Sequence, residues 1–354
     1  MCPMVSDQPI KIGMVGVGYI GQIAHLANYM EMEGCEVAAI AEVRPGLRDA
    51  VQAHYGIPQA FPTHRDLLDN AEVDALVAVT RRHHVGPVAL DCLQVGKHLL
   101  TEKPMAATLQ QAEKLAAAAE KAGARYAVGY MKRYDEGVQL AKGLLDELLE
   151  SGELGSLTLA RLYCFQGHNF YDCAKAVGLG EARPEDLDAW PVAPDWLPQE
   201  LCDDYDAFMN VCTHDINLMR YLFDGTPEAV RLDYRKEAGS VALFDYSDFP
   251  AVFEFETFKH GDWCEGVEIF FQRGRLTIRL PAPLLKNVSA QVTLQRDAEG
   301  DKEETFEAGQ DWSFRRQARA FVDDLRENRD SIASGRDAVE DIRLAEDLWK
   351  GLVS

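Results

Sequence analysis

The 354-residue sequence lacks features that would each indicate a class of protein. It has no excess of positive charge, because 36 Lys and Arg stand against 58 Asp and Glu, a net charge of −22 at pH 7. Such a field repels phosphate backbones and anionic lipid, so nucleic acid and membrane surfaces are not expected as partners. No run approaches the roughly 18 to 20 apolar residues that span a bilayer, and residues 1–10 lack the basic-then-apolar order of a secretory signal. A cytoplasmic protein is expected.

Paired cysteines are also missing. The eight cysteines are scattered, none forms a Cys-x-x-Cys pair, and a chain of this length does not need disulfides to stay folded. Cys164, His168 and Cys173 offer three side chains that zinc can bind, but their spacing matches no common zinc site and no fourth ligand is evident. We therefore predict no metal.

The length predicts two domains, at roughly 150 residues per domain. Short apolar strands alternate with helices up to residue 129, which is typical of a parallel sheet with helices on both faces. Residues 1–129 are therefore predicted to form a doubly wound α/β domain. The pattern predicts strands at 10–15, 36–41, 75–79, 98–101 and 126–129, and helices at 21–32, 47–55, 87–95 and 108–122.

A different pattern follows in residues 130–354. The stretch 166–210 contains four prolines and little periodicity, so a functional loop is expected there. Consecutive strands without long intervening helices come next, and such strands pair antiparallel. We predict a C-terminal α+β domain with an open, mostly antiparallel sheet. Its expected helices are 137–150, 210–223, 312–326 and 336–352, and its clearest strands are 156–164, 251–258, 267–271 and 275–280.

A glycine-rich turn, Gly-Val-Gly-Tyr-Ile-Gly at residues 16–21, joins the first strand to the first helix. Its first Gly permits a tight turn, its second lets the backbone approach a pyrophosphate, and its third lets helix and strand pack closely. Glu42 ends the second strand, where an acidic side chain accepts hydrogen bonds from the adenosine ribose. We infer a dinucleotide-binding Rossmann domain that prefers NAD to NADP, because a carboxylate repels a 2′-phosphate, although Arg44 softens that preference. The alternative is a glycine-rich turn without a ligand.

Several further motifs complete a pattern. Gly96-Lys97-His98 ends a helix, Glu102-Lys103-Pro104 follows the next strand, and residues 129–134 read Gly-Tyr-Met-Lys-Arg-Tyr. With His214 in a later helix, the set resembles the glucose-fructose oxidoreductase / inositol dehydrogenase (Gfo/Idh/MocA) family over nearly the whole chain. The resemblance implies NAD(P)-dependent oxidation or reduction of a sugar or cyclitol carbon by a homodimer or homotetramer. It also implies a cis Lys103–Pro104 peptide, a choice that only an X-Pro bond makes readily.

The resemblance also assigns the cofactor contacts. Matching the family motifs residue by residue places them at Gly16, Gly18, Tyr19, Ile20, Gly21, Glu42, Thr80, Glu102 and Lys103.

The implied reaction needs a proton acceptor beside the hydroxyl that is oxidised. An imidazole, whose ordinary pKa is about 6.5, suits this role, and the resemblance assigns it to His214. Lys103 would hydrogen-bond the reacting oxygen and stabilise its developing charge. Asn210 stands where relatives have Asp, four residues before the His, so it can orient a hydroxyl but cannot take a proton. Asp215 points elsewhere on the helix and is not expected to replace that Asp.

Other positions are expected to contact substrate. Arg133, His168 and Asp172 are assigned to this role. A second departure from the family pattern is the turn that follows Thr80, which reads Arg-Arg-His-His at residues 81–84. These residues form either a solvated turn or a contact to substrate or pyrophosphate.

An acidic stretch, residues 181–206, holds nine Asp and Glu against one base, Arg183. If these carboxylates border the substrate pocket, they favour a cationic substrate such as an amino sugar or an aminoglycoside-like pseudosaccharide. The alternative is a solvated loop of an acidic protein. Trp190 and Trp196 either stack on a sugar ring or anchor the loop.

The preferred hypothesis is an NAD-dependent dehydrogenase acting on a secondary hydroxyl of a sugar, amino sugar or cyclitol. One alternative uses NAD for transient oxidation that cleaves a glycosidic bond. The other is an NAD-binding regulator without catalysis, against which the presence of both Lys103 and His214 argues.

Overall fold

The structure is a computed structural model. Its chain divides into two units. The first unit contains residues 1–130, 174–194 and 314–342, and the second contains residues 131–173, 195–313 and 343–354. The first segment of the first unit ends at residue 130, and two later segments also belong to that unit. The described residues are 8–167, 175–178, 180–236, 238–258, 261–297 and 302–353.

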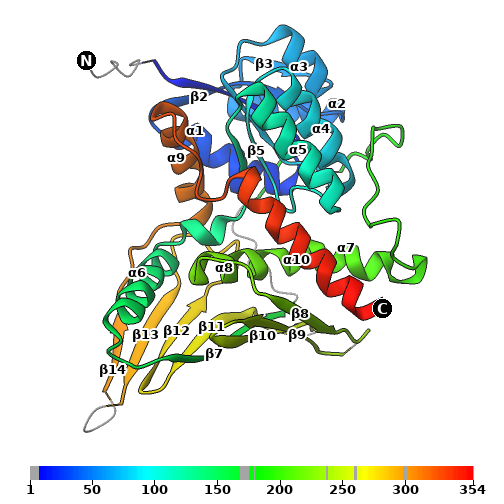
Figure 1. Cartoon of the computed structure of the whole chain (residues 1–354). Helices are drawn as coiled ribbons and strands as arrows, with labels where there is room; N and C mark the ends of the chain where they lie inside the picture. The colour runs from blue at the N-terminus through cyan, green and yellow to red at the C-terminus, as the bar shows by residue number, and fades with distance from the viewer. Residues whose placement is uncertain are drawn as a thin grey trace. The chain divides into compact units, whose positions relative to one another are not determined.

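The first unit is built on a six-stranded parallel sheet in the order β3-β2-β1-β4-β5-β6 (Figure 1). Ile12 and Met14 in the central strand are fully buried, which explains its nearly continuous apolar sequence. The strand order reverses beside β1, and in such sheets the ligand crevice lies outside the carboxyl ends of the strands at that point. The strands are β1 (Ile10–Val15), β2 (Cys35–Ala41), β3 (Gln59–Phe61), β4 (Ala75–Ala78), β5 (His98–Thr101) and β6 (Tyr126–Val128).

The helices of the first unit follow most of the sequence signals. Thr108 caps α5 by accepting a hydrogen bond from the Gln111 amide, and Gly123 ends that helix with a φ of 66°, as the capping box predicts. The helices are the π-helix η1 (Gly21–Leu26), α1 (Ala27–Glu31), α2 (Pro45–Tyr55), α3 (His64–Asn70), α4 (Arg82–Gln94), α5 (Leu109–Ala122) and α9 (Ser313–Arg326).

Three features of the first unit differ from expectation. β3 and α3 were not predicted, because three and seven residues are too few to show a periodicity. α4 begins at Arg82, five residues before the expected start, so Pro87 lies inside the helix instead of opening it. The first helix begins as a π-helix instead of an α-helix throughout.

The second unit is built on an eight-stranded sheet in the order β14-β13-β12-β11-β7-β10-β9-β8. β7 and β10 pair in parallel and every other described pair is antiparallel, so the prediction of a mostly antiparallel sheet is confirmed. The strands are β7 (Leu157–Gln166), β8 (Ala229–Asp233), β9 (Ser240–Tyr246), β10 (Phe249–Thr257), β11 (Cys264–Phe271), β12 (Gly274–Leu280), β13 (Gln291–Arg296) and β14 (Lys302–Phe306).

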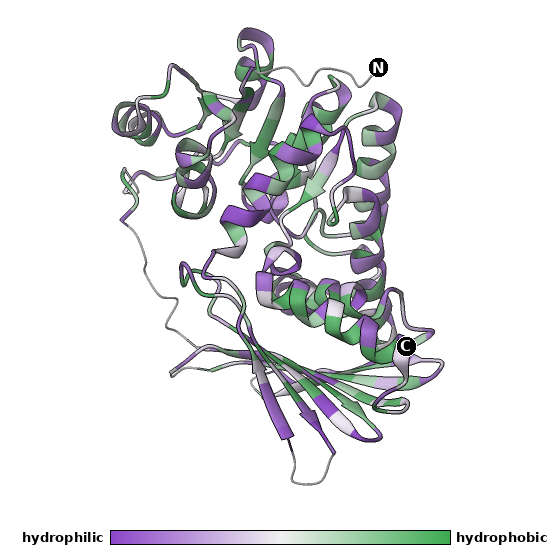
Figure 2. Ribbon diagram, turned by 90° about the vertical axis from the view of Figure 1, so that its left-hand side faces the viewer, coloured by the Kyte–Doolittle hydropathy of each residue, from purple (hydrophilic) through white to green (hydrophobic). Residues whose placement is uncertain are grey.

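The two faces of this sheet differ. Helix α6 (Glu136–Ser151) packs on β12 and β13, and α8 (Thr213–Phe223) packs on β7. On the other face Arg161 makes a bidentate ion pair with Glu254 and a second ion pair with Glu268. Figure 2 shows hydrophobic and hydrophilic residues mixed along these strands, as expected for a sheet with one covered face. The remaining helices are η2 (Met131–Tyr134), η3 (Gln199–Leu201), α7 (Cys202–Val211) and α10 (Gly335–Val353).

The stretch expected to be an irregular loop contains α7, and this helix changes the placement of a predicted site residue. Asn210 lies near the end of α7, whereas His214 lies in α8. The break falls at Cys212, where the Thr213 hydroxyl donates to the Met209 carbonyl at 2.8 Å. The prediction of one helix carrying both residues at i and i+4 is therefore wrong.

None of the described helices is long and apolar enough to cross a membrane.

Candidate functional site

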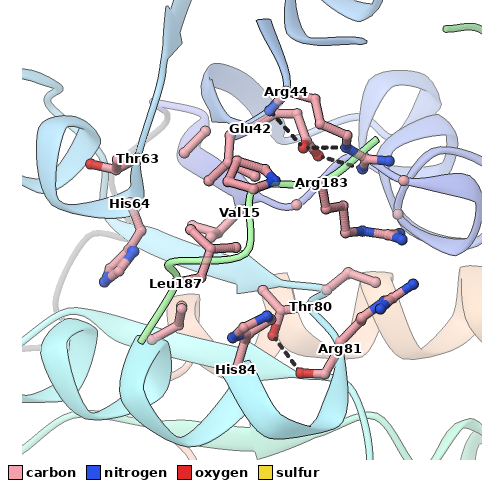
Figure 3. A pocket seen from close by; sticks show the side chains of 18 of the residues that line it. Val15, Glu42, Arg44, Thr63, His64, Thr80, Arg81, His84, Arg183 and Leu187 are labelled. Atoms are coloured by element: carbon pink, nitrogen blue, oxygen red, sulfur yellow. Dashed lines mark hydrogen bonds and ion pairs between the residues drawn. The ribbon is translucent and has the colours of Figure 1, made fainter. Parts of the chain in front are cut away.

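A cavity of about 660 Å³ lies at the carboxyl ends of β1, β2 and β4 in the first unit (Figure 3). Its walls come from the glycine-rich turn, the end of β2, the start of α3 and the turn into α4. A switch point of a parallel sheet is where dinucleotides bind in this architecture. The residues that were predicted to contact a cofactor and that line this cavity are Gly16, Gly18, Tyr19, Ile20, Gly21, Glu42 and Thr80.

The glycine-rich turn leaves no room for a side chain at its first glycine. Gly16 has a φ of +83°, and a Cβ atom there would overlap the Val79 carbonyl oxygen. A Cβ atom on Gly18 would meet the guanidinium of Arg44 at 3.5 Å and that of Arg183 at 3.9 Å. The turn therefore presents bare backbone to two cations, which fits a group bearing phosphates.

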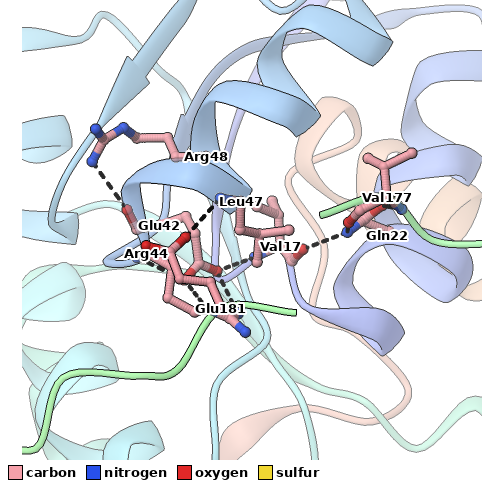
Figure 4. A network of polar contacts seen from close by, with 8 residues as sticks. All are labelled: Val17, Gln22, Glu42, Arg44, Leu47, Arg48, Val177 and Glu181. Carbon is pink, nitrogen blue, oxygen red and sulfur yellow. Dashed lines mark hydrogen bonds and ion pairs between the residues drawn. The ribbon is translucent and has the colours of Figure 1, made fainter. Parts of the chain in front are cut away.

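Glu42 is buried, and its two carboxylate oxygens are fully engaged (Figure 4). One oxygen accepts from the backbone N–H and Nε of Arg44, at 3.2 and 2.8 Å. The other accepts from the Val17 amide at 3.1 Å and from Arg44 Nη2 at 3.0 Å. A carboxylate has about four acceptor positions, so the ribose contact expected of Glu42 requires one of these bonds to yield.

The Glu-Lys-Pro turn after β5 is held by a buried pair. Glu102 accepts a hydrogen bond from His25 at 2.7 Å, and the Lys103 amide donates to the same carboxylate at 3.2 Å. Burial opposes ionisation, but the His25 hydrogen bond and the charges of His25 and Lys103 outweigh it and lower the pKa of Glu102. The Lys103–Pro104 peptide is cis, as the resemblance implied. Glu102 and Lys103 are not among the residues that line the cavity.

The acidic stretch does not behave as one surface. Its early part belongs to the first unit and its later part, from Asp195, to the second. Glu181 accepts from the Leu47 amide at 3.0 Å, which caps α2, and Asp188 pairs with Arg65 at 2.7 Å. These two carboxylates are therefore committed to contacts within the first unit, and the cationic substrate stays a prediction.

Trp190 anchors the chain instead of facing a cavity. Its amide donates to the His83 carbonyl at 2.8 Å, and Lys114 lies over its ring at 4.9 Å. Its ring lies against Gly86, where any Cβ atom would overlap it. Of the two expectations for this residue, the anchoring one fits these contacts.

In the second unit, His214 and Asp215 lie at the start of α8. The buried Asp215 carboxylate lies 3.5 Å from the Lys132 ammonium, which also pairs with the buried Glu265. Burial raises the pKa of Asp215 despite that ammonium. Asp215 is thus engaged with Lys132, and its exclusion from the catalytic role stays a prediction.

Cys164 completes a buried group with Asp215 and Glu265, whose potential metal-binding atoms lie within 4.8 Å of one another. The Lys132 ammonium supplies the positive charge to this group. Trp263 Nε1 donates to Glu265 at 2.8 Å. Within the described residues this group is therefore an ion-paired core cluster, and we assign it no metal.

The remaining predicted substrate contacts are placed as follows. Arg133 is buried, donates to the Asn217 carbonyl at 3.2 Å and lies over the Tyr221 ring at 5.4 Å. These contacts help to hold α8, and the substrate contact of Arg133 stays a prediction. His168 and Asp172 lie outside the described residues, as does Cys173 of the expected Cys164 group.

Two residues that line the cavity, Arg81 and Arg183, were not assigned as cofactor contacts from the sequence. For Arg81 the sequence allows either a solvated turn or a contact to substrate or pyrophosphate. The available signal for Arg183 was its isolation as the one base in an acidic stretch.

Comparisons with known proteins agree with this geometry. The model of the oxidoreductase family with an NAD-binding Rossmann fold, GFO_IDH_MocA, matches residues 10–130. Inositol 2-dehydrogenase of Salmonella typhimurium is 31% identical over 150 residues, which cover 41% of this chain and 43% of that protein. The match thus spans less than half of that relative's length. Myo-inositol 2-dehydrogenase of Thermotoga maritima is 20% identical over 354 residues and covers 93% of this chain and 92% of that protein.

Solved structures share the fold of the whole chain. Levoglucosan dehydrogenase, in complex with NADH and levoglucosan, superposes with a TM-score of 0.77 at 18% identity and covers 98% of both chains. At that identity the likeness establishes the fold alone. The family match and the glycine-rich turn together indicate an NAD-binding Rossmann domain in residues 10–130.

Proposed function

We propose that this chain belongs to the Gfo/Idh/MocA family of oxidoreductases and that it is an NAD-dependent dehydrogenase. Its substrate would be a secondary hydroxyl, or the corresponding ketone, of a sugar, amino sugar or cyclitol. The observation that carries the proposal is the cavity at the sheet's switch point, where the glycine-rich turn, Glu42 and Thr80 come together. Lys103 follows the neighbouring strand β5 of the same sheet.

Different residues of the chain would bind the cofactor, stabilise charge, accept the proton and orient the substrate. The backbone of the glycine-rich turn and the Thr80 side of the cavity would bind NAD, which when bound accepts a hydride from the substrate carbon. Lys103 would donate a hydrogen bond to the reacting oxygen and stabilise its negative charge. His214 would accept the hydroxyl proton as general base. Asn210 would orient a neighbouring hydroxyl.

The test is the appearance of NADH at 340 nm when the purified protein is given NAD and a panel of neutral sugars, cyclitols and amino sugars. Turnover of at least one member supports the dehydrogenase, and turnover confined to neutral members excludes a cationic substrate. Sugar release from a glycoside without net NADH would favour redox-assisted bond cleavage instead. NAD binding without turnover of any member would favour a regulator.

The chain would act as a homodimer or homotetramer. The uncovered face of the eight-stranded sheet supports this proposal, because it presents Tyr163 and Arg161 beside one another. Tyr and Arg are among the residues enriched in protein interfaces.

A further inference from the structure

Residues 175–178 and 180–194, which we call the strap, run across the first unit beside the NAD cavity. At one end the strap is fixed to η1, because Val177 N–H donates to Gln22 Oε1 at 2.9 Å and Gln22 Nε2 donates to the Val177 carbonyl at 3.0 Å (Figure 4). Next, Glu181 caps α2 through the Leu47 amide. The strap therefore starts on both helices that flank the glycine-rich turn and the end of β2.

The other end of the strap is fixed to α4 by a feature of that helix. Pro87 has no N–H, so it cannot bond the carbonyl four residues earlier, which is that of His83. The Trp190 amide of the strap donates to that carbonyl at 2.8 Å. Gly86 leaves the space that the Trp190 ring fills. The strap is thus docked at a site that the sequence of α4 provides.

Between these two ends the strap lines the cavity. Arg183, Pro184, Asp186, Leu187 and Asp188 all contribute to its wall (Figure 3). This segment is therefore part of the cofactor site, although it is distant in sequence from the Rossmann strands.

The side chains that line the cavity carry more unpaired positive than negative charge. Glu42 is paired with Arg44 and Asp188 with Arg65, which leaves Asp186 against Arg81 and Arg183. In the part of the chain that the structure describes, no carboxylate pairs with the guanidinium of Arg81 or Arg183. Figure 3 shows both side chains extending to the same side of the cavity. Burial, and then the charges of Arg44 and Arg81, lower the pKa of Arg183, so the three guanidiniums are close enough to repel.

Two of these guanidinium groups lie close to the glycine-rich turn at Gly18. Both Arg44 and Arg183 have a terminal nitrogen within 4 Å of the position that a Cβ atom on Gly18 would take. Guanidiniums bind phosphate oxygens through charge-assisted hydrogen bonds, and a dinucleotide brings its phosphates to such a turn.

We propose that Arg183 is a phosphate ligand of the bound dinucleotide, and that through it the strap holds the cofactor in the cavity. Arg44 and Arg81 complete the cationic group. The inference rests on dinucleotide binding, and it does not depend on the reaction proposed above. The phosphate is either that of the pyrophosphate, which NAD and NADP share, or the 2′-phosphate of NADP, because Arg44 already neutralises Glu42.

The test is direct titration of NADH, NADPH, ADP-ribose and adenosine, by calorimetry or nicotinamide fluorescence, against the wild-type chain and two variants. Arg183→Gln should raise the Kd for NADH about tenfold or more and leave the Kd for adenosine unchanged. Arg183→Lys, which keeps the charge, should recover part of the loss. Lys121→Gln removes an exposed charge from the end of α5 and is the matched control, expected to bind as wild type.

The ligands distinguish the two phosphates. An equal loss for ADP-ribose, NADH and NADPH places Arg183 on the pyrophosphate, and a larger loss for NADPH places it on the 2′-phosphate. The inference is overturned if Arg183→Gln binds NADH as wild type does, or if it weakens adenosine as much as NADH. A wild-type chain that binds NADH but oxidises no polyol would contradict the proposed function alone.

Discussion

Lys103 and His214 are the two side chains on which the proposed reaction depends at the residue scale. We expect Lys103→Met and His214→Asn each to lower kcat by about 10²- to 10⁴-fold, because each removes a group that acts on the reacting oxygen. The Kd for NADH should change little in His214→Asn, because His214 is not among the predicted cofactor contacts. Steady-state kinetics together with NADH titration would measure both quantities. In the direction of alcohol oxidation, His214→Asn should also abolish the fall in kcat/KM at acid pH. A variant that keeps this limb would show that another group takes the proton.

Lys132 is the counter-ion of two buried carboxylates, so its loss should affect folding. Lys132→Met leaves Asp215 and Glu265 facing each other without a cation, which should lower the free energy of unfolding by about 3 to 5 kcal/mol. Urea unfolding followed by circular dichroism measures this change. The double variant Lys132→Met/Glu265→Gln should recover part of the stability, because it removes one of the two charges. A single variant as stable as wild type would mean that the carboxylates are already protonated.

At the scale of elements, the strap is docked on α4 through the contacts of Trp190. Gly86→Val would place side-chain atoms where the Trp190 ring lies, and Pro87→Ala would supply an N–H that competes with Trp190 for the His83 carbonyl. If the strap retains the cofactor, the rate constant for NADH dissociation should rise about tenfold in Gly86→Val and less in Pro87→Ala. Stopped-flow displacement of NADH measures it.

Gly143→Ala is the control for these substitutions. It lies in α6 of the second unit, where a Cβ atom would meet no other atom within 4 Å. It should leave NADH dissociation unchanged and favour the helix slightly. An unchanged dissociation rate in both Gly86→Val and Pro87→Ala would show that the strap does not limit release of the cofactor.

The elements also show where sequence patterns succeed. The buried strands of the first unit are apolar and bounded by turn residues, so β1 and β5 were predicted to the residue. The glycine-rich turn and Glu42 were placed on one cavity because their spacing reflects local geometry. The strap was not predicted, because Trp190 and Val177 bond to residues more than a hundred positions away. No local periodicity encodes such contacts.

The break between α7 and α8 was hidden for a different reason. The residues around Cys212 keep helical dihedral angles, and the break interrupts only the helical hydrogen bonds. The sequence pattern therefore predicts one continuous helix. The sequence also could not show that the acceptor positions of Glu42 are all occupied, because these hydrogen bonds depend on the conformation of the neighbouring Arg44.

At the scale of the whole molecule, the proposal is that chains associate through the uncovered face of the eight-stranded sheet. We expect light scattering after size-exclusion chromatography to give two or four times the chain mass of 39.4 kDa. Arg279 is exposed on β12, opposite Gly266 of β11, in the row that includes Tyr163. Arg279→Glu should weaken association, whereas Lys121→Glu in the first unit should not. A monomer at micromolar concentration would contradict this assignment of the face.

The proposed reaction needs one residue from each unit, because Lys103 belongs to the first and His214 to the second. The most direct measurement is a crystal structure of the protein with NAD and a polyol that it turns over. We predict that one substrate hydroxyl lies within hydrogen-bond distance of both the Lys103 ammonium and the His214 imidazole. A polyol whose hydroxyls all lie beyond the reach of either group would contradict the proposed reaction.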